Sequence, residues 1–387
     1  MSQYDFDKLG PLPELLGDRA GAVTSVITPA GDPMWLVRDY ALARLVLTDR
    51  RFSRAEAVKP DAPWLNDAQP TPDSMMSMDG ADHARLRRLV AGMFSTGRAA
   101  AMAPTIERVV SGHLDQIEAS GPGTDLVAGL AAPLPLAVLC SLLGVPEEDS
   151  TRFRGWVEVL FDISATSPRE KARHRLDLNR YMLELIRRKR ERNEPDVLSE
   201  LIAAHDRGEM SMPELVTMGL ALLMAGYETT VGQIGLTVLA LLTDPQTHAA
   251  VRESPDRLAS TIEELTRLTP ATPISFPRIA VEPVPLGDVT VQAGEAVVVS
   301  LLDANRDGQA FAEPAVLRSD RHGPGHLTFG HGAHRCLGAP LAGLQVHLAV
   351  ELLLRRFPGL RLDPSPDAVL WKNGLATRGL TRLRVTW

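Results

Sequence analysis

Apolar residues recur at intervals of three and four along most of this chain, and that spacing predicts a mainly α-helical fold. The longest such stretch, 214–243, is apolar nearly all round, which indicates a helix buried in the middle of the molecule. It opens with Ser211-Met-Pro-Glu214, a capping box with proline in the first turn. The same periodicity predicts further helices over 40–48, 101–119, 145–161, 169–193, 258–267 and 341–357, and one that begins at Asp82.

Alternating apolar and polar positions predict a smaller β-rich part. The stretches 23–28 and 34–38 flank Gly31-Asp-Pro33, which is typical of a hairpin turn. Strands are also expected within 281–300 and in the tail, 358–387. No repeat, low-complexity tract or linker interrupts the pattern, so residues 1–387 are expected to form one domain.

Composition narrows the classes of function. The net charge of −7 over 387 residues argues against a nucleic-acid-binding protein, because such proteins carry a basic excess. The two cysteines, Cys140 and Cys336, cannot form a disulfide framework, which fits a reducing cytosol. The uncharged stretch 126–146 contains prolines, so it predicts a buried core helix rather than a membrane span. Because the N-terminus does not resemble a signal peptide, a soluble, cytoplasmic protein is expected.

Candidate chemistry is concentrated at 329–338, which reads FGHGAHRCLG. Its glycines allow the backbone to pass where a side chain would collide, as it must against a flat ligand. Pro340 suits the first turn of a helix, so Cys336 is expected just before a helix N-terminus, whose dipole favours the thiolate. A thiolate on a tight loop is a soft and strongly donating metal ligand.

Three interpretations of Cys336 are open from the residues alone. A lone cysteine is most often buried and inert. A zinc site would use neighbouring histidines, although their spacing lacks a standard ligand frame; the candidates are His322, His326, His331 and His334. The third interpretation is a haem-thiolate site, in which the cysteine donates electron density to iron.

The cysteine loop resembles the haem-ligand signature of the cytochrome P450 family. Phe329, Gly332, His334, Cys336 and Gly338 fill the pattern F-x-x-G-x-H-x-C-x-G. The resemblance implies that Cys336 is the axial iron ligand and that Phe329 packs near its sulfur. It also implies that His334 bonds a haem propionate and that Gly338 belongs to the same cofactor-binding set.

A second motif lies in the middle of the long predicted helix. Ala225-Gly226-Tyr-Glu228-Thr229-Thr230 matches the family's oxygen-activation pattern A-G-x-[D/E]-T-T. Glycine followed by β-branched threonines is a poor choice for an ordinary buried helix, and a threonine hydroxyl can bond the carbonyl of the preceding turn. The resemblance implies that Ala225 lies at the haem, that Thr229 hydrogen-bonds dioxygen, and that Glu228 relays protons. A purely structural reason for Gly226, a close helix crossing, stays open beside it.

Other residues match the family's haem contacts. His83 and Arg87 are four apart and share a helix face, so they resemble the family's propionate clamp. Arg278 occupies the place of a second propionate-binding arginine, and Ala342 would let the helix after the cysteine approach the porphyrin.

A further match is structural. Glu264 and Arg267 fit the pattern E-x-x-R, and Arg321 fits the third place of the buried network that this pattern forms in the family. Ala315 and Leu317 depart from the usual residues of the segment before Arg321, which leaves the anchoring of that segment open.

The stretch 55–80 is polar and rich in proline, and such a long loop is usually functional. In the family it roofs the substrate pocket, so Trp64, Met75 and Met76 are candidate pocket residues, unless they only fix the loop to the body. Ile274 and Ser275 are candidates from the strand beside the second arginine, and residues 374–377 could reach the pocket as well.

Across the whole chain the resemblance implies a cytochrome P450 fold: a helical domain with a smaller β-rich region, and haem b between the long central helix and the helix after the cysteine loop. It implies a soluble bacterial class I monooxygenase that receives electrons from NAD(P)H through a ferredoxin and a ferredoxin reductase. The expected reaction is hydroxylation or epoxidation of a small organic substrate in natural-product tailoring, carried out by a monomer. Two alternatives stay open: oxidative coupling of an aromatic or peptide substrate, and a non-catalytic haem sensor, which would need no Glu228–Thr229 proton relay.

Overall fold

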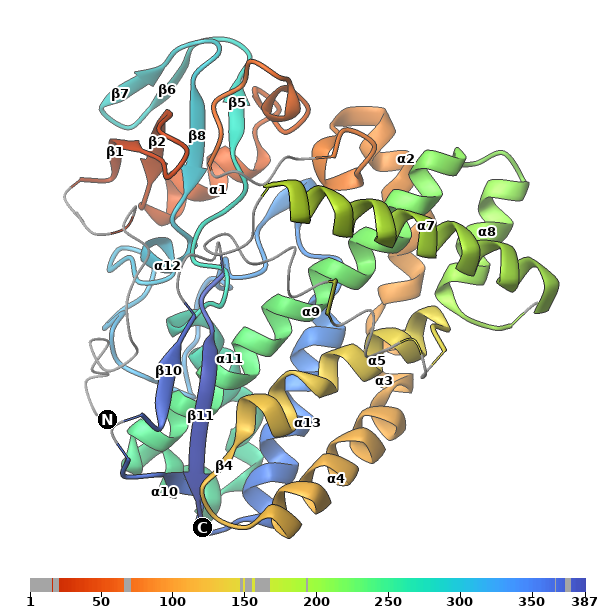
Figure 1. The fold of residues 1–387 in the computed structure, drawn as a ribbon. Helices are drawn as coiled ribbons and strands as arrows, with labels where there is room; N and C mark the ends of the chain where they lie inside the picture. The colour runs from red at the N-terminus through yellow and green to blue at the C-terminus, as the bar shows by residue number, and fades with distance from the viewer. Residues whose placement is uncertain are drawn as a thin grey trace.

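A long central helix organises the structure, with one β-sheet at an end of the molecule and a second sheet along its side (Figure 1). The computed structural model describes residues 21–65, 71–146, 168–192, 194–365, 367–372 and 377–387, together with Leu16, Asp149, Gly155 and Trp156. The α-helices in this part of the chain are α1 (Tyr40–Thr48), α2 (Gly80–Ala91), α3 (Thr96–Ala101), α4 (Ala103–Ser120), α5 (Pro133–Leu143), α7 (Pro168–Arg192), α8 (Val197–Asp206), α9 (Met212–Thr243), α10 (Pro245–Glu253), α11 (Leu258–Leu268), α12 (Leu301–Ala304) and α13 (Ala339–Arg356). The predicted mainly α-helical fold is confirmed.

The strands are short and form small sheets. They are β1 (Val23–Ile27), β2 (Pro33–Val37), β3 (Phe52–Ser53), β4 (Thr124–Asp125), β5 (Arg278–Ala280), β6 (Val284–Leu286), β7 (Val289–Val291), β8 (Ala296–Val299), β9 (Arg361–Leu362), β10 (Val369–Trp371) and β11 (Leu380–Thr386). The end sheet has the order β1-β2-β8-β5-β3, in which β2 and β8 are parallel. The side sheet is built on β11, which pairs with β10, β4 and β9, and β6 and β7 form a separate hairpin.

Helix α9 is the central helix that the sequence predicts, and it begins with the predicted capping box. The Ser211 hydroxyl accepts a hydrogen bond of 3.3 Å from the Glu214 N–H, and the Glu214 carboxylate accepts one of 2.7 Å from the Ser211 N–H. Helices α5, α7 and α13 pack against α9, so most of its length is buried. Among the described residues α9 is the one helix long and apolar enough to cross a membrane, but 56% of that apolar window is buried inside the protein.

Most predicted element bounds agree with the structure. Helix α1 covers the predicted range 40–48, because the Asp39 carboxylate accepts the Leu42 N–H at 2.8 Å and caps the helix. The predicted single helix over 101–119 is wrong at its start, since α3 ends there and α4 begins separately after Met102, with proline in its first turn. The predicted helix over 145–161 lies mostly outside the described residues. The stretch 126–146 forms a π-helical turn, Val127–Ala131, followed by the buried helix α5.

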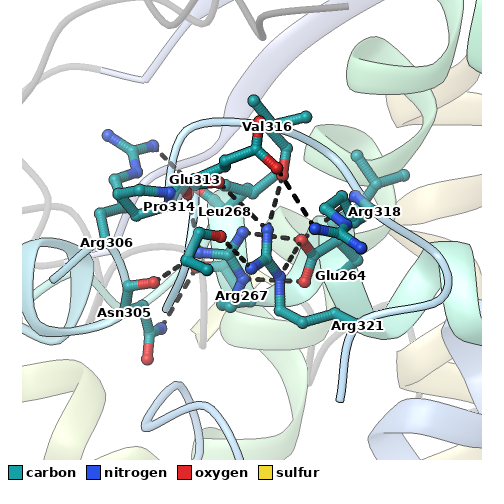
Figure 2. Close-up of polar contacts among 12 residues, drawn as sticks. Glu264, Arg267, Leu268, Asn305, Arg306, Glu313, Pro314, Val316, Arg318 and Arg321 are labelled. Atoms are coloured by element: carbon teal, nitrogen blue, oxygen red, sulfur yellow. Dashed lines mark hydrogen bonds and ion pairs between the residues drawn. The ribbon is translucent and has the colours of Figure 1, made fainter. Parts of the chain in front are cut away.

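A buried ion network on α11 fixes the segment that leads to the cysteine loop. Figure 2 shows the Glu264 carboxylate between two guanidinium groups: Arg267 donates to its two oxygens at 2.7 and 2.8 Å, and Arg321 donates to one of them at 2.7 Å. The side chains of Arg267 and Glu264 are 2% and 5% exposed. The network therefore withdraws the Glu264 carboxylate and the Arg267 guanidinium from bulk water, while the Arg321 side chain keeps 11% exposure.

The same arginines bind backbone carbonyls of the segment 305–316. Arg267 donates to the Asn305 and Pro314 carbonyls at 2.6 and 2.9 Å, and Arg321 donates to the Val316 carbonyl at 2.8 Å. Backbone carbonyls are supplied by any residue type. For this reason the two departures from the family pattern in this segment leave its anchoring intact.

We predict that replacing Glu264 by glutamine (E264Q) strongly destabilises the protein. The substitution keeps the shape of the side chain but leaves two buried guanidinium groups without their compensating charge. Breaking a buried ion network in this way costs about 3–5 kcal/mol of unfolding free energy. Urea denaturation at neutral pH measures the loss. The control is R180M, which breaks an exposed pair of the same i,i+3 spacing, Arg180–Asp177, and should change stability little.

The destabilisation by E264Q should depend on pH. Burial acts to raise the pKa of Glu264, but hydrogen bonds from Arg267 and Arg321 outweigh it and hold this pKa below the ordinary 4.5. A group whose pKa is lowered in the folded state stabilises the fold fully above its unfolded pKa, and that stabilisation is lost as the pH falls through the lower folded value. The difference between wild type and E264Q should therefore shrink below about pH 4.5. A difference that stays constant into the acid range would contradict this assignment.

Candidate active site

The loop that carries Cys336 is closed by its own backbone. The Cys336 N–H donates to the Phe329 carbonyl at 2.8 Å, and the Gly330 N–H donates to the Leu327 carbonyl at 2.7 Å. The loop leads directly into α13, and Cys336 is exposed. The interpretation as a buried, inert cysteine is therefore wrong for Cys336, whereas it describes Cys140, which is buried in α5.

Gly332 is required by a protein contact rather than by a ligand. Its φ is +72°, and a Cβ placed on it would lie 2.9 Å from both the Leu47 carbonyl oxygen and a methyl carbon of Thr48 at the end of α1. Gly338 differs, since no atom lies within 4 Å of the position of its Cβ. The flat-ligand explanation from the sequence therefore suits Gly338, while Gly332 is needed for the packing of the loop against α1.

Opposing effects act on the Cys336 thiol. Although one side of the residue is exposed, the surrounding protein raises the pKa of the thiol by desolvation. Backbone N–H groups of Gly338 and Ala339 and the charges of Arg335 and Arg87 act to lower the pKa, but the net direction is upward from 9.0. The N–H groups at the helix N-terminus therefore favour the thiolate, as the sequence predicts, but in the protein alone desolvation outweighs them. A coordinated metal cation reverses this balance, because it deprotonates a ligating thiol.

The histidines near Cys336 point to separate partners. The partners and distances are His326 to Glu263, 3.1 Å; His331 to Arg44, 3.3 Å; and His334 to Asp79, 3.5 Å. His322 is exposed. In the described part of the chain no three His, Cys, Asp or Glu side chains are grouped so that they could hold a metal ion. The zinc interpretation is therefore wrong.

Basic side chains gather around one carboxylate beside the cysteine loop. Arg54, Arg278 and His83 are buried, and the His83 ring lies 4.1 Å from the His334 ring. The carboxylate that these basic side chains surround belongs to Asp79. One of its oxygens accepts hydrogen bonds from the Ser53 hydroxyl at 2.6 Å and from the N–H groups of Arg54 and Ala55 at 2.8 and 2.9 Å. Asp79 is thus fixed in place by three donors.

The pKa values in this cluster reflect burial first and repulsion between neighbouring cations second. Burial and the nearby Arg278 lower the pKa of Arg54 to about 9, and burial lowers the pKa of Arg278 to about 10. Burial, together with His334 and Arg87, lowers the pKa of His83 to about 4. Burial acts to raise the pKa of Asp79, but hydrogen bonds from His334 and its other donors hold it well below its usual range. One carboxylate does not balance these arginines, so the cluster suits a bound anion.

The residues present fit a haem, the group implied by the cysteine motif. The Nε2 atom of His83 is buried and has no hydrogen-bond partner among the described residues, so it is free to bond a propionate. Arg87 is half-buried and donates to the Arg335 carbonyl at 2.7 Å, which ties α2 to the cysteine loop. Gly338 and the half-buried Ala342, on the first turn of α13, leave room for a flat ring. Two propionates would supply the negative charge that the cluster requires.

The motif in α9 divides between two faces of the helix. Ala225 is exposed and Thr229 half-buried, while Glu228 is buried. The Thr229 hydroxyl donates to the Ala225 carbonyl at 2.8 Å, as the sequence predicts, and α9 continues without a break. A Cβ on Gly226 would lie 2.9 Å from a methyl carbon of Leu139 in α5. The close helix crossing proposed for Gly226 is therefore confirmed.

The loop candidates for the substrate pocket have different surroundings. The Trp64 N–H donates to Asp32, and the Trp64 carbonyl accepts from the Thr28 hydroxyl, both at 2.7 Å, so the backbone of Trp64 fixes the loop to the β1–β2 turn. Met75 packs against the main hydrophobic core, while Met76 is exposed. Of these residues, Met76 is the one whose side chain is most open to a ligand.

The strand candidates also differ from one another. The Ser275 hydroxyl accepts the Val299 N–H at 3.0 Å and is buried, so it is engaged by the end sheet. Ile274 is half-buried, and the next aromatic residue, Phe276, is 58% exposed. Residues 374–376 lie outside the described residues.

Sequence reasoning missed several residues of the site, among them Arg54, Phe276 and Lys372. Arg54 donates to the Met76 carbonyl at 3.0 Å and to the Pro277 carbonyl, and its guanidinium lies 5.0 Å from the centre of the Phe276 ring. It therefore joins the long loop to the strand β5. No local pattern signals the contacts with Phe276 and Pro277, because these residues lie more than 200 positions from Arg54.

Known proteins resemble this chain over nearly its whole length. A family model described as Cytochrome P450 matches residues 19–372. Nocardicin C N-oxygenase of Nocardia uniformis subsp. tsuyamanensis is 41% identical over 361 residues, which cover 93% of this chain and 91% of the relative. Mycinamicin IV hydroxylase/epoxidase of Micromonospora griseorubida is 38% identical over 367 residues, covering 94% and 92%. The solved structure of cytochrome P450mel 107F1 with biaryl coupling reactivity has a TM-score of 0.90 at 37% identity, covering 98% of this chain and 97% of that one.

We predict that G332A destabilises the cysteine loop. The added methyl group meets Leu47 and Thr48 at 2.9 Å, and alanine is strained at a φ of +72°. Together these effects should cost about 2–4 kcal/mol of unfolding free energy. Urea denaturation measures the loss, and haem content after reconstitution reports the loop itself. Gly325, which has open space around its Cβ position, provides the control G325A. Equal stability of the two variants would show that α1 does not support the loop.

Proposed function

The chain belongs to the cytochrome P450 family, and from that premise we propose that it hydroxylates or epoxidises a small organic molecule in the tailoring of a natural product. It is an enzyme of the cytochrome P450 monooxygenase type, which uses haem b and electrons from NAD(P)H delivered by redox partners. The observation that carries the proposal is the exposed Cys336 at the start of α13, beside a buried cluster of basic side chains.

Cys336 is assigned as the ligand of the haem iron. Bound through this thiolate, the haem supplies the binding of dioxygen and the reductive cleavage of its O–O bond. The backbone N–H groups of Gly338 and Ala339 point to the sulfur and stabilise its negative charge. Phe329 lies on the same loop and holds the Cys336 N–H through its carbonyl, so it fixes the direction of the cysteine.

The propionates are assigned to the basic cluster. His83 offers a buried nitrogen without a hydrogen-bond partner among the described residues, and Arg278 and Arg54 offer buried charge. Arg87 and His334 complete the set from α2 and the cysteine loop. Bidentate guanidinium groups suit carboxylates, so these residues orient the cofactor as well as neutralise it.

Thr229 and Glu228 are assigned to proton delivery. The Thr229 hydroxyl rests on the Ala225 carbonyl, from which it can rotate to donate toward the open face of α9. Glu228 is the adjacent acid and is buried, so it can carry a proton from water toward that hydroxyl. Ala225, being small, leaves this face open.

A ferredoxin and a ferredoxin reductase are proposed as the redox partners, with the enzyme acting as a cytoplasmic monomer. Arg335, next to Cys336, is exposed, as is Arg88 on α2. Positive charge near the thiolate supports docking of an acidic ferredoxin, because complementary charge steers association.

Oxidative coupling of an aromatic or peptide substrate is the second candidate reaction. Its support is the TM-score of 0.90 to a cytochrome P450 with biaryl coupling reactivity. Both candidates use the same site residues. The non-catalytic sensor has no such support, because the relatives are named as an oxygenase and a hydroxylase/epoxidase.

The first prediction concerns Cys336. The reduced, haem-loaded protein should give, with carbon monoxide, the far red-shifted Soret band of thiolate-ligated haem. The variant C336H should shift this band to the position typical of histidine ligation. A histidine-type band in well-folded wild-type protein would refute the ligand assignment.

A further prediction concerns Thr229. T229A should uncouple electron use from product formation, because the hydroxyl that passes the proton is lost. Positioned proton donors contribute factors of about 10²–10⁴, so peroxide released per NADPH should rise by about tenfold or more. T229S keeps the hydroxyl and should retain coupling. Unchanged coupling in T229A would place the proton route elsewhere.

A further inference from the structure

The C-terminal hairpin, formed by β10 and β11, lies directly on the face of α9 that carries Glu228. Gly232 and Gly235 follow Glu228 on that face, one and two turns later. A Cβ on Gly232 would lie 2.6 Å from the Arg378 carbonyl oxygen, and one on Gly235 would lie 3.6 Å from a methyl carbon of Leu380. Glycine at 232 is therefore what allows the chain before β11 to touch the helix backbone.

This contact brings Lys372 to Glu228. The Lys372 N–H donates to the Gly379 carbonyl at 3.0 Å, which fixes the backbone immediately after β10. Its ammonium group then lies 2.5 Å from a carboxylate oxygen of Glu228. The two side chains are 17% and 4% exposed, so the pair is largely withdrawn from water. Figure 1 shows β10 and β11 along the lower left of the molecule, and β11 contacts α9.

The pair differs from the ion pairs that Asp367 makes with Arg382 and Arg384 of the same hairpin. Arg382 and Asp367 lie 2.9 Å apart, but their side chains are 34% and 50% exposed, and such pairs contribute little. A buried pair must be kept intact, because loss of one partner leaves the other charge uncompensated. Replacing a buried ion pair by apolar residues of similar volume is often neutral or stabilising, so stability alone does not account for charges here.

The position of Glu228 suggests what the pair is for. Consecutive residues of an α-helix point about 100° apart, so Glu228 faces the hairpin while Thr229 faces toward the open side of α9. Glu228 lies between the hairpin face and the open face of α9. Its carboxylate can therefore pass a proton toward the Thr229 hydroxyl only from a defined orientation. Lys372 restricts the carboxylate to one orientation through a charged hydrogen bond.

We propose that Lys372 is a positioning residue for proton delivery, holding the Glu228 carboxylate where it passes protons toward Thr229. The inference rests on the proposed monooxygenase function. Insertion of one oxygen atom with release of the other as water consumes two protons and two electrons, so in each cycle Glu228 twice takes a proton from water and releases it on the Thr229 side. The charges of the carboxylate and the ammonium are therefore restored, and the electrons come from NAD(P)H. The C-terminal hairpin thereby takes part in catalysis through Lys372.

The test compares K372M with E228Q, both haem-loaded and supplied with NADPH, a plant-type ferredoxin and its reductase, without added substrate. NADPH consumption, peroxide released per NADPH and the solvent deuterium isotope effect are measured. In these measured quantities K372M should show the same change from wild type as E228Q, about tenfold. The reason is that misplacing a catalytic group has an effect close to that of removing it. The double variant E228Q/K372M should be no worse than E228Q, and K372R, which keeps a cation, should restore the wild-type values.

R382M is the matched control, since it removes one of the two exposed ion pairs of Asp367 in the same hairpin and should behave as wild type. If K372M lowers the thermal midpoint but keeps wild-type values while E228Q does not, the pair is structural only and the proposal is overturned. The proposal is also overturned if the effects of E228Q and K372M multiply in the double variant E228Q/K372M. If K372M does not fold, E228Q/K372M is compared with E228Q, and any further loss in the double variant overturns the proposal. A wild type without the thiolate Soret band would instead refute the proposed function.

Discussion

Glu264 has its carboxylate buried on α11, where an unpaired charge would be strongly destabilising, so the fold must bring cations to it. Arg267 and Arg321 provide them, and the backbone around Arg267 extends the constraint toward the cysteine. The Asn305 side chain donates to the Arg267 carbonyl at 3.2 Å, and its oxygen accepts the Leu327 N–H at 2.6 Å. Leu327 in turn accepts the Gly330 N–H of the loop. A continuous series of hydrogen bonds thus runs from the buried carboxylate to the loop that presents Cys336.

The loop is held from its other side by α1, which is tied to the same segment. The Tyr40 N–H donates to the Asp307 carboxylate at 2.8 Å, and the Tyr40 ring packs edge-on against Phe311 at 5.4 Å. At the far end of α1, the Leu47 carbonyl meets Gly332 of the loop. The loop is therefore positioned between two supports that share the segment 305–316, and Cys336 acquires a fixed direction before any cofactor binds.

The local sequence was sufficient to predict those features of the structure that neighbouring residues determine. The Asp39 cap and the Ser211 capping box define helix starts, and the spacing of Glu264 and Arg267 predicts their pairing within one helix. It was insufficient where tertiary packing decides. Arg54 is buried through contacts with β5 and the long loop, which no pattern around it indicates. The helix N-terminus that acts to lower the pKa of Cys336 is visible in the sequence, whereas the desolvation that outweighs it is not.

Helix α9 shows why the acid and the alcohol of one motif can serve different parts of the fold. Two of its neighbours approach on different faces, α5 at Gly226 and the C-terminal hairpin at Gly232, and a third face is open at Ala225. At Gly226 and Gly232 the absence of a side chain permits the contact, and Ala225 keeps the third face open. Because adjacent residues of a helix point in different directions, Glu228 is necessarily turned to the hairpin when Thr229 is turned to the open side. The proton-carrying pair therefore depends on contacts at positions 225, 226 and 232 as well as on its own two residues.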